Sequence, residues 1–285
     1  MFKHYYSLTK PGIIYGNLIT VSGGYFLASH GNIDFIKYFF TMLGITLVVA
    51  SGCVINNIID KDIDCLMERT KNRVMVQGLI PVKMAYIYGI TLGIIGALFL
   101  YYGVNKLTLS TALIGWFFYI VVYTLFLKRK SVYGTIVGSI SGAIPPVVGY
   151  VAVTNRIDLG ACILFAILSL WQIPHSYAIA IFRLQDYTNA AINIMPVKNG
   201  IYKTKVSMLV YTLLFSIATI MLSLCGYTGS WYLVISTVSC LYWIRLAIVG
   251  FYTIDDKMWA RKMFVASIII ITILSLMMSI DFSRA

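Results

Sequence analysis

Charged residues are scarce in this chain. Only 11% of the 285 residues are Asp, Glu, Lys or Arg, against about 25% in an ordinary soluble domain. Because 60% of the residues are hydrophobic and the mean hydropathy is +0.86, there is too little polar surface to cover a soluble core. The composition excludes soluble, fibrous and disordered proteins and predicts a polytopic membrane protein.

Cysteine is also sparse and without pattern. The five cysteines form no CxxC pair, so the sequence indicates neither a disulfide framework nor a zinc site. The 22 Lys and Arg outnumber the 10 Asp and Glu, which gives a formal charge of +12. In a membrane protein this excess belongs to cytoplasmic loops, so it does not indicate a nucleic-acid partner.

Long charge-free runs predict the membrane spans. Six of them cover residues 11–29, 38–55, 84–105, 107–127, 131–155 and 159–182. The run 206–244 would make a helix of about 58 Å at 1.5 Å per residue, nearly twice the hydrocarbon thickness of about 30 Å. It must therefore fold back at Gly226–Ser230, giving helices near 205–225 and 231–252. With a last run at 263–280, the sequence predicts an all-α protein of nine transmembrane helices.

The basic residues predict the orientation of these helices. With nine spans, 18 of the 22 Lys and Arg lie on one side, and the other side has only Lys37, Lys106, Arg156 and Arg284. The positive-inside rule then places the N-terminus in the cytoplasm and the C-terminus outside. We interpret residues 1–30 as including a span rather than a signal peptide, because the apolar run is long enough to cross. Residues 1–285 are predicted to form one transmembrane domain with long cytoplasmic loops at about 56–82 and 183–204.

The first of these loops contains a row of metal-binding residue types. If the preceding helix continues inward, Asn56, Asp60 and Asp64 recur every four residues on one face, while Asp62 points the opposite way. Neighbouring carboxylates repel each other, and a divalent cation between them reverses that repulsion. Oxygen ligands suit Mg²⁺, which binds one or two carboxylates together with substrate phosphates. The row therefore predicts a Mg²⁺-diphosphate site; a solvated, salt-bridged loop is the alternative.

Basic residues near this row are candidates for phosphate binding. Arg69, Lys71 and Arg73 follow the acids directly. Lys128 and Arg129 could also contact phosphate, although they could equally anchor the end of a helix. In the second loop, Asp186 has Arg183 three residues before it, which an ordinary ion pair at a helix end explains as well.

Polar groups inside the apolar spans are further candidates. In the helix at 159–182, Trp171 and His175 share a face, Gln172 lies beside them, and Pro174 is expected to kink the helix. An ionisable side chain within a span is a functional candidate, though a hydrogen-bonded core histidine remains possible. Glycines 134, 138 and 142 predict a close helix contact, and the prolines at 145 and 146 require a neighbour that satisfies the freed carbonyls.

Several strings resemble a known family. Asn56-Asn57-x-x-Asp60-x-x-x-Asp64 is similar to the first acidic motif of the UbiA-type intramembrane prenyltransferases. The longer string from Asn56 to Arg73, together with those at 9–12, 142–146 and 171–177, looks specifically like the haem-farnesylating members of that family, the haem O synthases. The resemblance extends from about residue 8 to about 280.

The resemblance implies a ring of helices around a lipid-open cavity in the inner (cytoplasmic) membrane. It implies farnesyl diphosphate and haem B as substrates, Mg²⁺ as cofactor, and haem O, destined for a haem-copper terminal oxidase, as product. By motif position, the metal ligands would be Asn56, Asp60, Asp64 and Asp186, and Arg69 and Arg73 would contact phosphate. Ala190 replaces a second aspartate, which makes a full second metal site doubtful. The remaining candidates for substrate binding are Asn57, Lys71, Lys128, Arg129, Trp171, Gln172, His175, Arg183 and Lys198.

Other functions stay open at this point. A prenyltransferase acting on a quinone precursor or a chlorophyll-type ring would carry the same acidic motif. Phosphatidyltransferases that act on CDP-alcohols have a DGxxAR signature, which is absent here. A transporter is the non-enzyme alternative, but it predicts charged groups near mid-membrane, whereas the acids here cluster at one mouth.

Overall fold

The structure, a computed structural model, describes residues 1–283. Arg284, which the topology prediction places outside, lies beyond the described residues. Within residues 1–283 the fold is helical, and the single isolated β-bridge joins Thr228 to Phe282. The predicted all-α fold is therefore confirmed.

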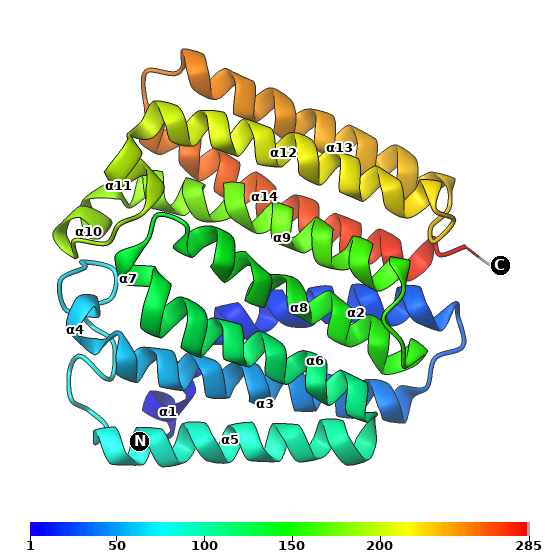
Figure 1. Ribbon diagram of the computed structural model, residues 1–285, viewed down its shortest axis with the longest axis horizontal. Helices are drawn as coiled ribbons and strands as arrows, with labels where there is room; N and C mark the ends of the chain where they lie inside the picture. Colours follow the sequence, from blue (N-terminus) through cyan, green and yellow to red (C-terminus); the bar gives the residue numbers. More distant parts are fainter. Residues whose placement is uncertain (284–285) are drawn as a thin grey trace.

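Nine long helices run roughly parallel across the molecule (Figure 1). Eight of those in residues 1–283 are long and apolar enough to span a membrane; α2 falls short by composition because it contains Asn17, two serines and four glycines. The nine are α2 (Pro11–Ser29), α3 (Phe35–Ile59), α5 (Val82–Gly103), the continuous α6 (Lys106–Phe117), η1 (Phe118–Leu127) and α7 (Lys128–Lys130), α8 (Gly134–Thr154), α9 (Leu159–Phe182), α12 (Ile201–Leu224), α13 (Ser230–Val249) with η2 (Gly250–Tyr252), and α14 (Asp256–Ile280).

The helix boundaries agree with the charge-free runs except at the last helix. The chain does fold back between α12 and α13, as the long run 206–244 required. However, α14 begins at Asp256 rather than near residue 263, because the side chain of Asp255 accepts a hydrogen bond from the Met258 N–H and caps the helix. Its first two turns therefore carry basic residues that the apolar run did not include.

Prolines lie inside two helices without ending them. α8 continues through Pro145 and Pro146, and α9 continues through Pro174 to Phe182. The carbonyl of Pro146 lies against Gly24 of α2, at a distance that leaves no room for a Cβ atom. A neighbouring helix thus covers the backbone at Pro146, as expected for a proline-containing helix within a membrane.

Close helix contacts depend on glycine at particular places. α2 packs along α8 and α14, and Gly149 of α8 lies against the backbone of Val21. On the glycine face of α8, Gly138 accommodates the ring of Tyr123 and Gly142 accommodates the side chain of Gln172. The face therefore does serve packing, and it also places two polar side chains beside α8.

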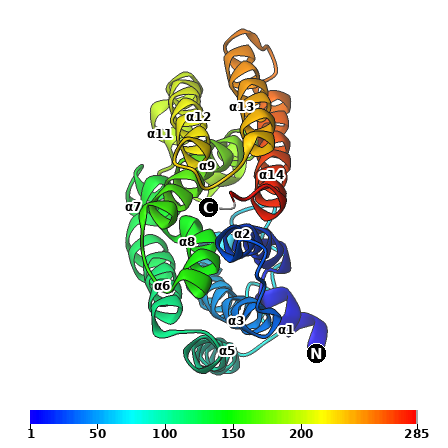
Figure 2. The same ribbon diagram turned by 90° about the vertical axis from the view of Figure 1, so that its right-hand side faces the viewer.

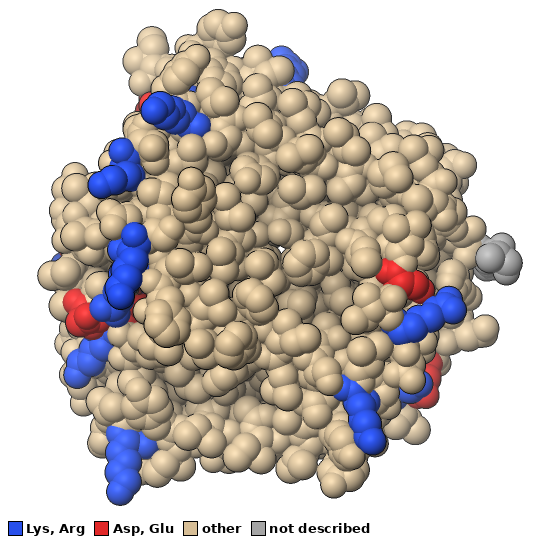
Figure 3. Space-filling view, in the orientation of Figure 1, with Lys and Arg blue, Asp and Glu red and all other residues tan. Residues whose placement is uncertain are grey.

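The two ends of the bundle differ. The short helices α4 (Lys61–Asp64), α10 (Leu184–Asn189) and α11 (Met195–Asn199) lie at the end that also holds α7, and the C-terminus lies at the other end (Figure 1). Viewed from the side in Figure 2, α12 and α13 form one edge of the bundle and α5 the opposite edge. On the face shown in Figure 3, basic side chains gather along the α4–α10 end, a band without charge follows, and fewer lie beyond it.

Candidate functional site

The acidic row lies where α3 ends. The Asp60 N–H donates to the Asn56 carbonyl at 2.9 Å and the Asp64 N–H donates to the Asp60 carbonyl at 2.8 Å, so helical bonding continues into α4. Asn56, Asp60 and Asp64 are all buried, whereas the Asp62 side chain is 65% exposed. The structure thus places the three residues on one inward face and Asp62 on the opposite one, as their spacing predicts.

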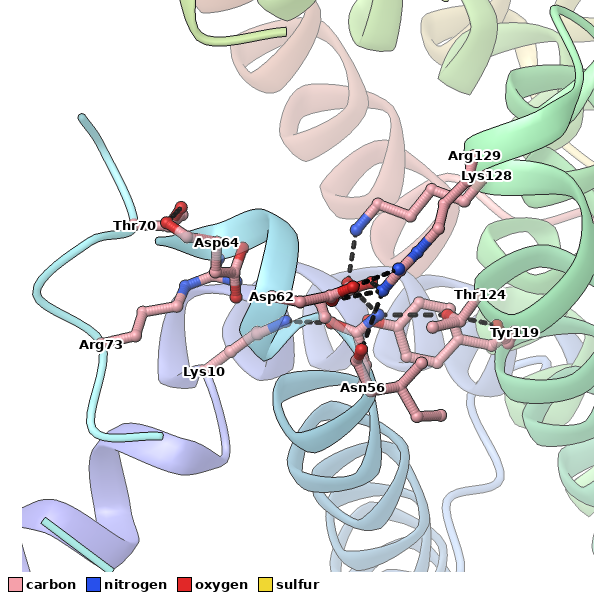
Figure 4. Close-up of polar contacts among 12 residues, drawn as sticks. Lys10, Asn56, Asp62, Asp64, Thr70, Arg73, Tyr119, Thr124, Lys128 and Arg129 are labelled. Carbon is pink, nitrogen blue, oxygen red and sulfur yellow. Dashed lines mark hydrogen bonds and ion pairs between the residues drawn. The ribbon is translucent and has the colours of Figure 1, made fainter. Parts of the chain in front are cut away.

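Each residue of the row contacts a cation from a different element; Figure 4 labels Lys10 with Asn56 and Arg73 with Asp64. Lys128 of α7 forms an ion pair with Asp60, and Arg73 of the first loop pairs with Asp64 at 2.5 Å. Lys10, which precedes α2, donates to the side-chain oxygen of Asn56. A buried carboxylate without a partner is costly, so these cations offset the cost of burying Asp60 and Asp64.

The π-helical segment η1 supplies a hydrogen-bond partner of Asn56 and two aromatic rings of the site. In η1 the Thr124 hydroxyl donates to the Tyr119 carbonyl, five residues back, and accepts a hydrogen bond from the Asn56 amide at 3.1 Å. The wider turn also stacks Tyr119 and Tyr123, whose ring centroids are 6.3 Å apart. π-Helical turns are rare and are frequent at functional sites, because they redirect side chains.

In the acidic row and in α10, three carboxylate oxygens are buried without a hydrogen-bond donor. They belong to Asp60, Asp64 and Asp186. An unsatisfied buried oxygen costs about 1–3 kcal/mol. Within residues 1–283 no three His, Cys, Asp or Glu side chains form a ready-made metal cage. Oxygen donors that stop short of a full cage fit Mg²⁺, which completes its coordination with water and substrate phosphates.

The second loop closes over the first. On α10, Asp186 accepts a hydrogen bond from the Glu68 N–H at 3.0 Å. Ala190 follows and packs with Ile63, Met67 and Ile192 in a small apolar cluster. The position where a second aspartate was expected is therefore part of an apolar contact between the loops.

A cavity of about 260 Å³ lies between the loops and the helices. Four cations reach it: Lys10, Arg69, Arg73 and Lys128. Within the described residues Arg69 forms no ion pair, so its charge remains available to an anion. The rest of the lining comes mainly from η1, α8, α9 and the second loop, and includes Tyr119, Tyr123, Gly134, Gly138, Ser141, Gln172, Ser176, Ile179, Tyr187 and Asn193.

Several predicted site residues lie elsewhere. Lys71 pairs with the exposed Glu68 at 2.6 Å, and Lys198 is exposed on α11. Arg129 binds Asp62 through two hydrogen bonds of 2.6 and 2.7 Å, which lower the pKa of the Asp62 carboxyl, and it lies 3.8 Å from Asp60 of the acidic row without lining the cavity. Arg183 is half-buried at the end of α9 and is not among the cavity-lining residues. These positions are peripheral to the cavity, and their predicted roles in substrate binding stay predictions.

The predicted haem contact also lies outside the cavity. His175 stacks on Trp171 with ring centroids 4.5 Å apart, and the Phe264 ring lies 4.9 Å from it. Its Nδ1 is 2.7 Å from the Ser267 hydroxyl, and the Trp171 indole donates to the Ser267 carbonyl. Both residues therefore connect α9 to α14, whereas their neighbour Gln172 lines the cavity. Asn57 similarly holds the N-terminal helix, because its amide donates to the Leu8 carbonyl.

Sequence reasoning missed Lys10, Tyr119, Tyr123 and Thr124 as members of the site. Lys10 lies in the string at residues 9–12, whose resemblance to the family assigns no role to this lysine. Its backbone is left-handed (φ 52°) directly before Pro11, an unfavourable conformation that tertiary contacts must hold. Burial, followed by the charges of Arg73 and Lys128, lowers the pKa of the Lys10 ammonium to about 8.

Comparison with known proteins identifies the family. A model of the UbiA prenyltransferase family matches residues 17–268. The chain belongs to this family. It is 55% identical over 282 residues to a curated protein of Cronobacter sakazakii named protoheme IX farnesyltransferase, and 56% identical over 283 residues to one of that name from Yersinia pseudotuberculosis. Each alignment covers 99% of this chain and 96% of the relative.

Solved structures show the same fold. A digeranylgeranylglyceryl phosphate synthase structure aligns with a TM-score of 0.81 at 21% identity, covering 98% of both chains. A UbiA homologue from Archaeoglobus fulgidus, bound to DMAPP and Mg²⁺, aligns with a TM-score of 0.70 at 15% identity, covering 97% of this chain and 99% of that one.

Proposed function

We propose that this protein transfers the farnesyl group of farnesyl diphosphate to a vinyl group of haem B, with addition of water, and releases haem O and diphosphate. The observation that carries the proposal is the buried acidic row beside four cations at a cavity, in a chain 55–56% identical to proteins named for this reaction. The family membership supports prenyl transfer as the chemistry.

The polar end of the cavity is assigned to the diphosphate. Asn56, Asp60, Asp64 and Asp186 would hold Mg²⁺, in keeping with the unsatisfied oxygens of the three acids. When bound, the metal neutralises charge on the leaving diphosphate oxygens. Lys10, Arg69, Arg73 and Lys128 would bind the remaining phosphate oxygens, since all four line the cavity. The Archaeoglobus fulgidus homologue bound to DMAPP and Mg²⁺ supports this assignment.

The remaining lining would hold the reacting end of the prenyl chain and the edge of the acceptor. At about 260 Å³ the cavity is smaller than a typical ligand pocket of about 300–1,000 Å³, so most of the farnesyl chain and the porphyrin would extend beyond it. The C–O bond to the diphosphate breaks, the allylic carbon bonds to the vinyl group, and water supplies the hydroxyl. The closed loops would exclude bulk water until the carbon–carbon bond has formed.

The cellular setting follows from the same proposal. The protein is a multi-pass membrane protein. We assign it to the inner (cytoplasmic) membrane with the acidic loops facing the cytoplasm, and we assign its product to a haem-copper terminal oxidase. The concentration of basic residues at the α4–α10 end supports this orientation.

Purified protein supplied with haem B, farnesyl diphosphate and Mg²⁺ tests the proposal. We expect a new pigment with the mass of haem O, and far less of it in the same time from an Asp60→Asn variant that is equally folded. A parallel reaction with an aromatic quinone precursor discriminates the acceptor. Prenylation of that compound, with haem B left unchanged, would contradict the assignment of haem as the acceptor.

A further inference from the structure

A second concave site lies far from the acidic loops in sequence, between α13 and α14. It is a groove of about 580 Å³. Arg261 and Lys262 of α14 line one end, and the wall continues along the same helix through Val265, Ile269 and Ile273. Tyr242 of α13 lines the opposite wall. The groove thus joins a cationic end to an apolar channel on the outer surface of a membrane protein.

The two cations have no acidic partner in the part of the chain that the structure describes, although the Arg261 guanidinium lies over the Phe182 ring, 6.0 Å from its centroid. Both are exposed, and neither forms an ion pair with any residue in the described range 1–283. The two acids at this end of α14 are already engaged, because Asp256 pairs with Lys205 at 2.5 Å and Asp255 caps the helix. Arg261 and Lys262 also lie near the N-terminus of α14, the positive end of the helix dipole, so the dipole does not stabilise their positive charges. A bound anion would supply the missing negative charge.

The apolar wall of the groove is about as long as the hydrocarbon layer of one leaflet. From Arg261 to Ile273 the helix rises by about 18 Å at 1.5 Å per residue, slightly more than the half-thickness of a hydrocarbon core of about 30 Å. Val265 and Ile269 are about half exposed, at 51% and 52%, so the channel opens sideways to its surroundings. An occupant with a charged head and a chain confined to one leaflet fits this shape.

We propose that the groove between α13 and α14 is a binding site for one anionic phospholipid. Its phosphate lies between Arg261 and Lys262, and one acyl chain follows Val265, Ile269 and Ile273. Basic pockets between transmembrane helices recognise anionic lipid head groups in this way. The positive-inside bias explains why cations lie at this end of the bundle, but it does not explain why they lie at the head of an apolar groove.

Lipid binding by the purified, delipidated protein tests this proposal. Native mass spectrometry in detergent is used to count bound lipids during titration with phosphatidylglycerol, and with phosphatidylcholine as the zwitterionic probe. We expect one phosphatidylglycerol to bind tightly and phosphatidylcholine to bind weakly. The double variant Arg261→Gln/Lys262→Gln should lose affinity by about 30-fold, since each basic residue near the membrane surface contributes about fivefold.

Two further variants separate the groove from charge alone. Lys83→Gln/Lys203→Gln removes the same charge from exposed positions outside the groove and should bind like the wild type. Ile269→Trp keeps both cations but fills the channel, and it should also lose the tight lipid. Equal binding by the groove variant and its control would overturn the proposal. So would tight binding of phosphatidylcholine, displacement of the lipid by farnesyl diphosphate, or a dimer that the groove variants abolish.

Discussion

The carboxylates of the first loop differ in what surrounds them. Asp60 and Asp64 are buried with one oxygen each unsatisfied, whereas Asp62 is exposed and bound to Arg129. Asp60→Asn and Asp64→Asn should each lower turnover by about 10²–10³-fold, the usual cost of losing one group that stabilises developing charge. Asp62→Asn should change turnover by less than about tenfold.

Turnover and Mg²⁺ affinity of the three folded variants provide the measurement. The metal affinity should fall for Asp60→Asn and Asp64→Asn but not for Asp62→Asn. Equal damage from all three substitutions would contradict the assignment of the inward face as the metal site.

The lowered pKa of Lys10 gives a dependence on pH with a defined sign. With its pKa at about 8, the free ammonium loses its proton as the pH rises through that value, because burial favours the neutral form. A diphosphate favours the charged form. Affinity for the prenyl diphosphate should therefore be highest below pH 8 and should fall above it by up to about tenfold per pH unit.

The pH dependence is measured as the affinity for an unreactive farnesyl diphosphate analogue between about pH 6 and 10. This range extends roughly two pH units to either side of the Lys10 pKa. Lys10→Arg should flatten the profile, since a guanidinium stays charged throughout. Lys10→Met should bind weakly at every pH. An unchanged decline in Lys10→Arg would mean that another group titrates.

The site could be predicted only in part, for a reason visible in single residues. The row at Asn56, Asp60 and Asp64 is local, so helical spacing alone places its members on one face. Lys10 and Thr124 reach the row from elements distant in sequence, and no spacing rule relates them to it. His175 was the reverse case: its residue type in a span indicated function, while its partners Trp171 and Ser267 lie on the side facing α14.

Between elements, the contact of α9 with α14 leads to a prediction for His175. Its ring is enclosed by Trp171 and Phe264, and its Nδ1 is bonded to Ser267. His175→Ala should lower the free energy of unfolding by about 1–3 kcal/mol, because it removes a buried ring from between Trp171 and Phe264 and deletes its hydrogen bond to Ser267. The apparent requirements for haem and for farnesyl diphosphate should change alike. A stable variant that needs more haem alone would instead support the haem contact inferred from the sequence.

The contact of α2 with α8 leads to a prediction for two glycines of α2. A Cβ atom at Gly24 would overlap the Pro146 carbonyl, whereas one at Gly16 meets no atom within 4 Å. Gly24→Ala should therefore destabilise the protein by roughly 1–3 kcal/mol, as overpacking does. Gly16→Ala is the matched control and should leave the thermal midpoint in detergent unchanged or slightly higher. Equal midpoints for the two variants would contradict the close approach of these helices.

The helices themselves were largely predictable, because hydrophobic spans cannot contain many charges. The exceptions have local causes. α14 starts earlier than its apolar run because Asp255 caps it. α2 is less apolar than a typical span, and two of its glycines, Gly23 and Gly24, lie against α14 and α8 rather than lipid. Amino-acid composition identifies helices apolar enough to face lipid. It does not identify a more polar helix, such as α2, that packs against other helices within the membrane.

For the whole molecule, the proposed nine crossings would place the two termini on opposite sides of the membrane. Reporter fusions after Arg73, Lys130 and Lys198 should report the cytoplasm, and fusions near Asn105 and Gly229 should report the outside, as the distribution of Lys and Arg predicts. A cytoplasmic result at Gly229 would contradict the turn between α12 and α13.

The cavity takes its lining from one continuous part of the chain. Among the residues that the structure describes, its lining begins at Lys10 and ends at Ile194, so α12, α13 and α14 contribute nothing to it. During synthesis, every residue of the charged mouth therefore leaves the ribosome before the last three helices do. Until α14 arrives, the side of α9 that carries Trp171 and His175 has no partner. A nascent chain paused after α11 would already contain every residue that lines the cavity, in a bundle still uncovered on one side. Insertion of α12, α13 and α14 would then cover that side of the bundle without adding a residue to the cavity.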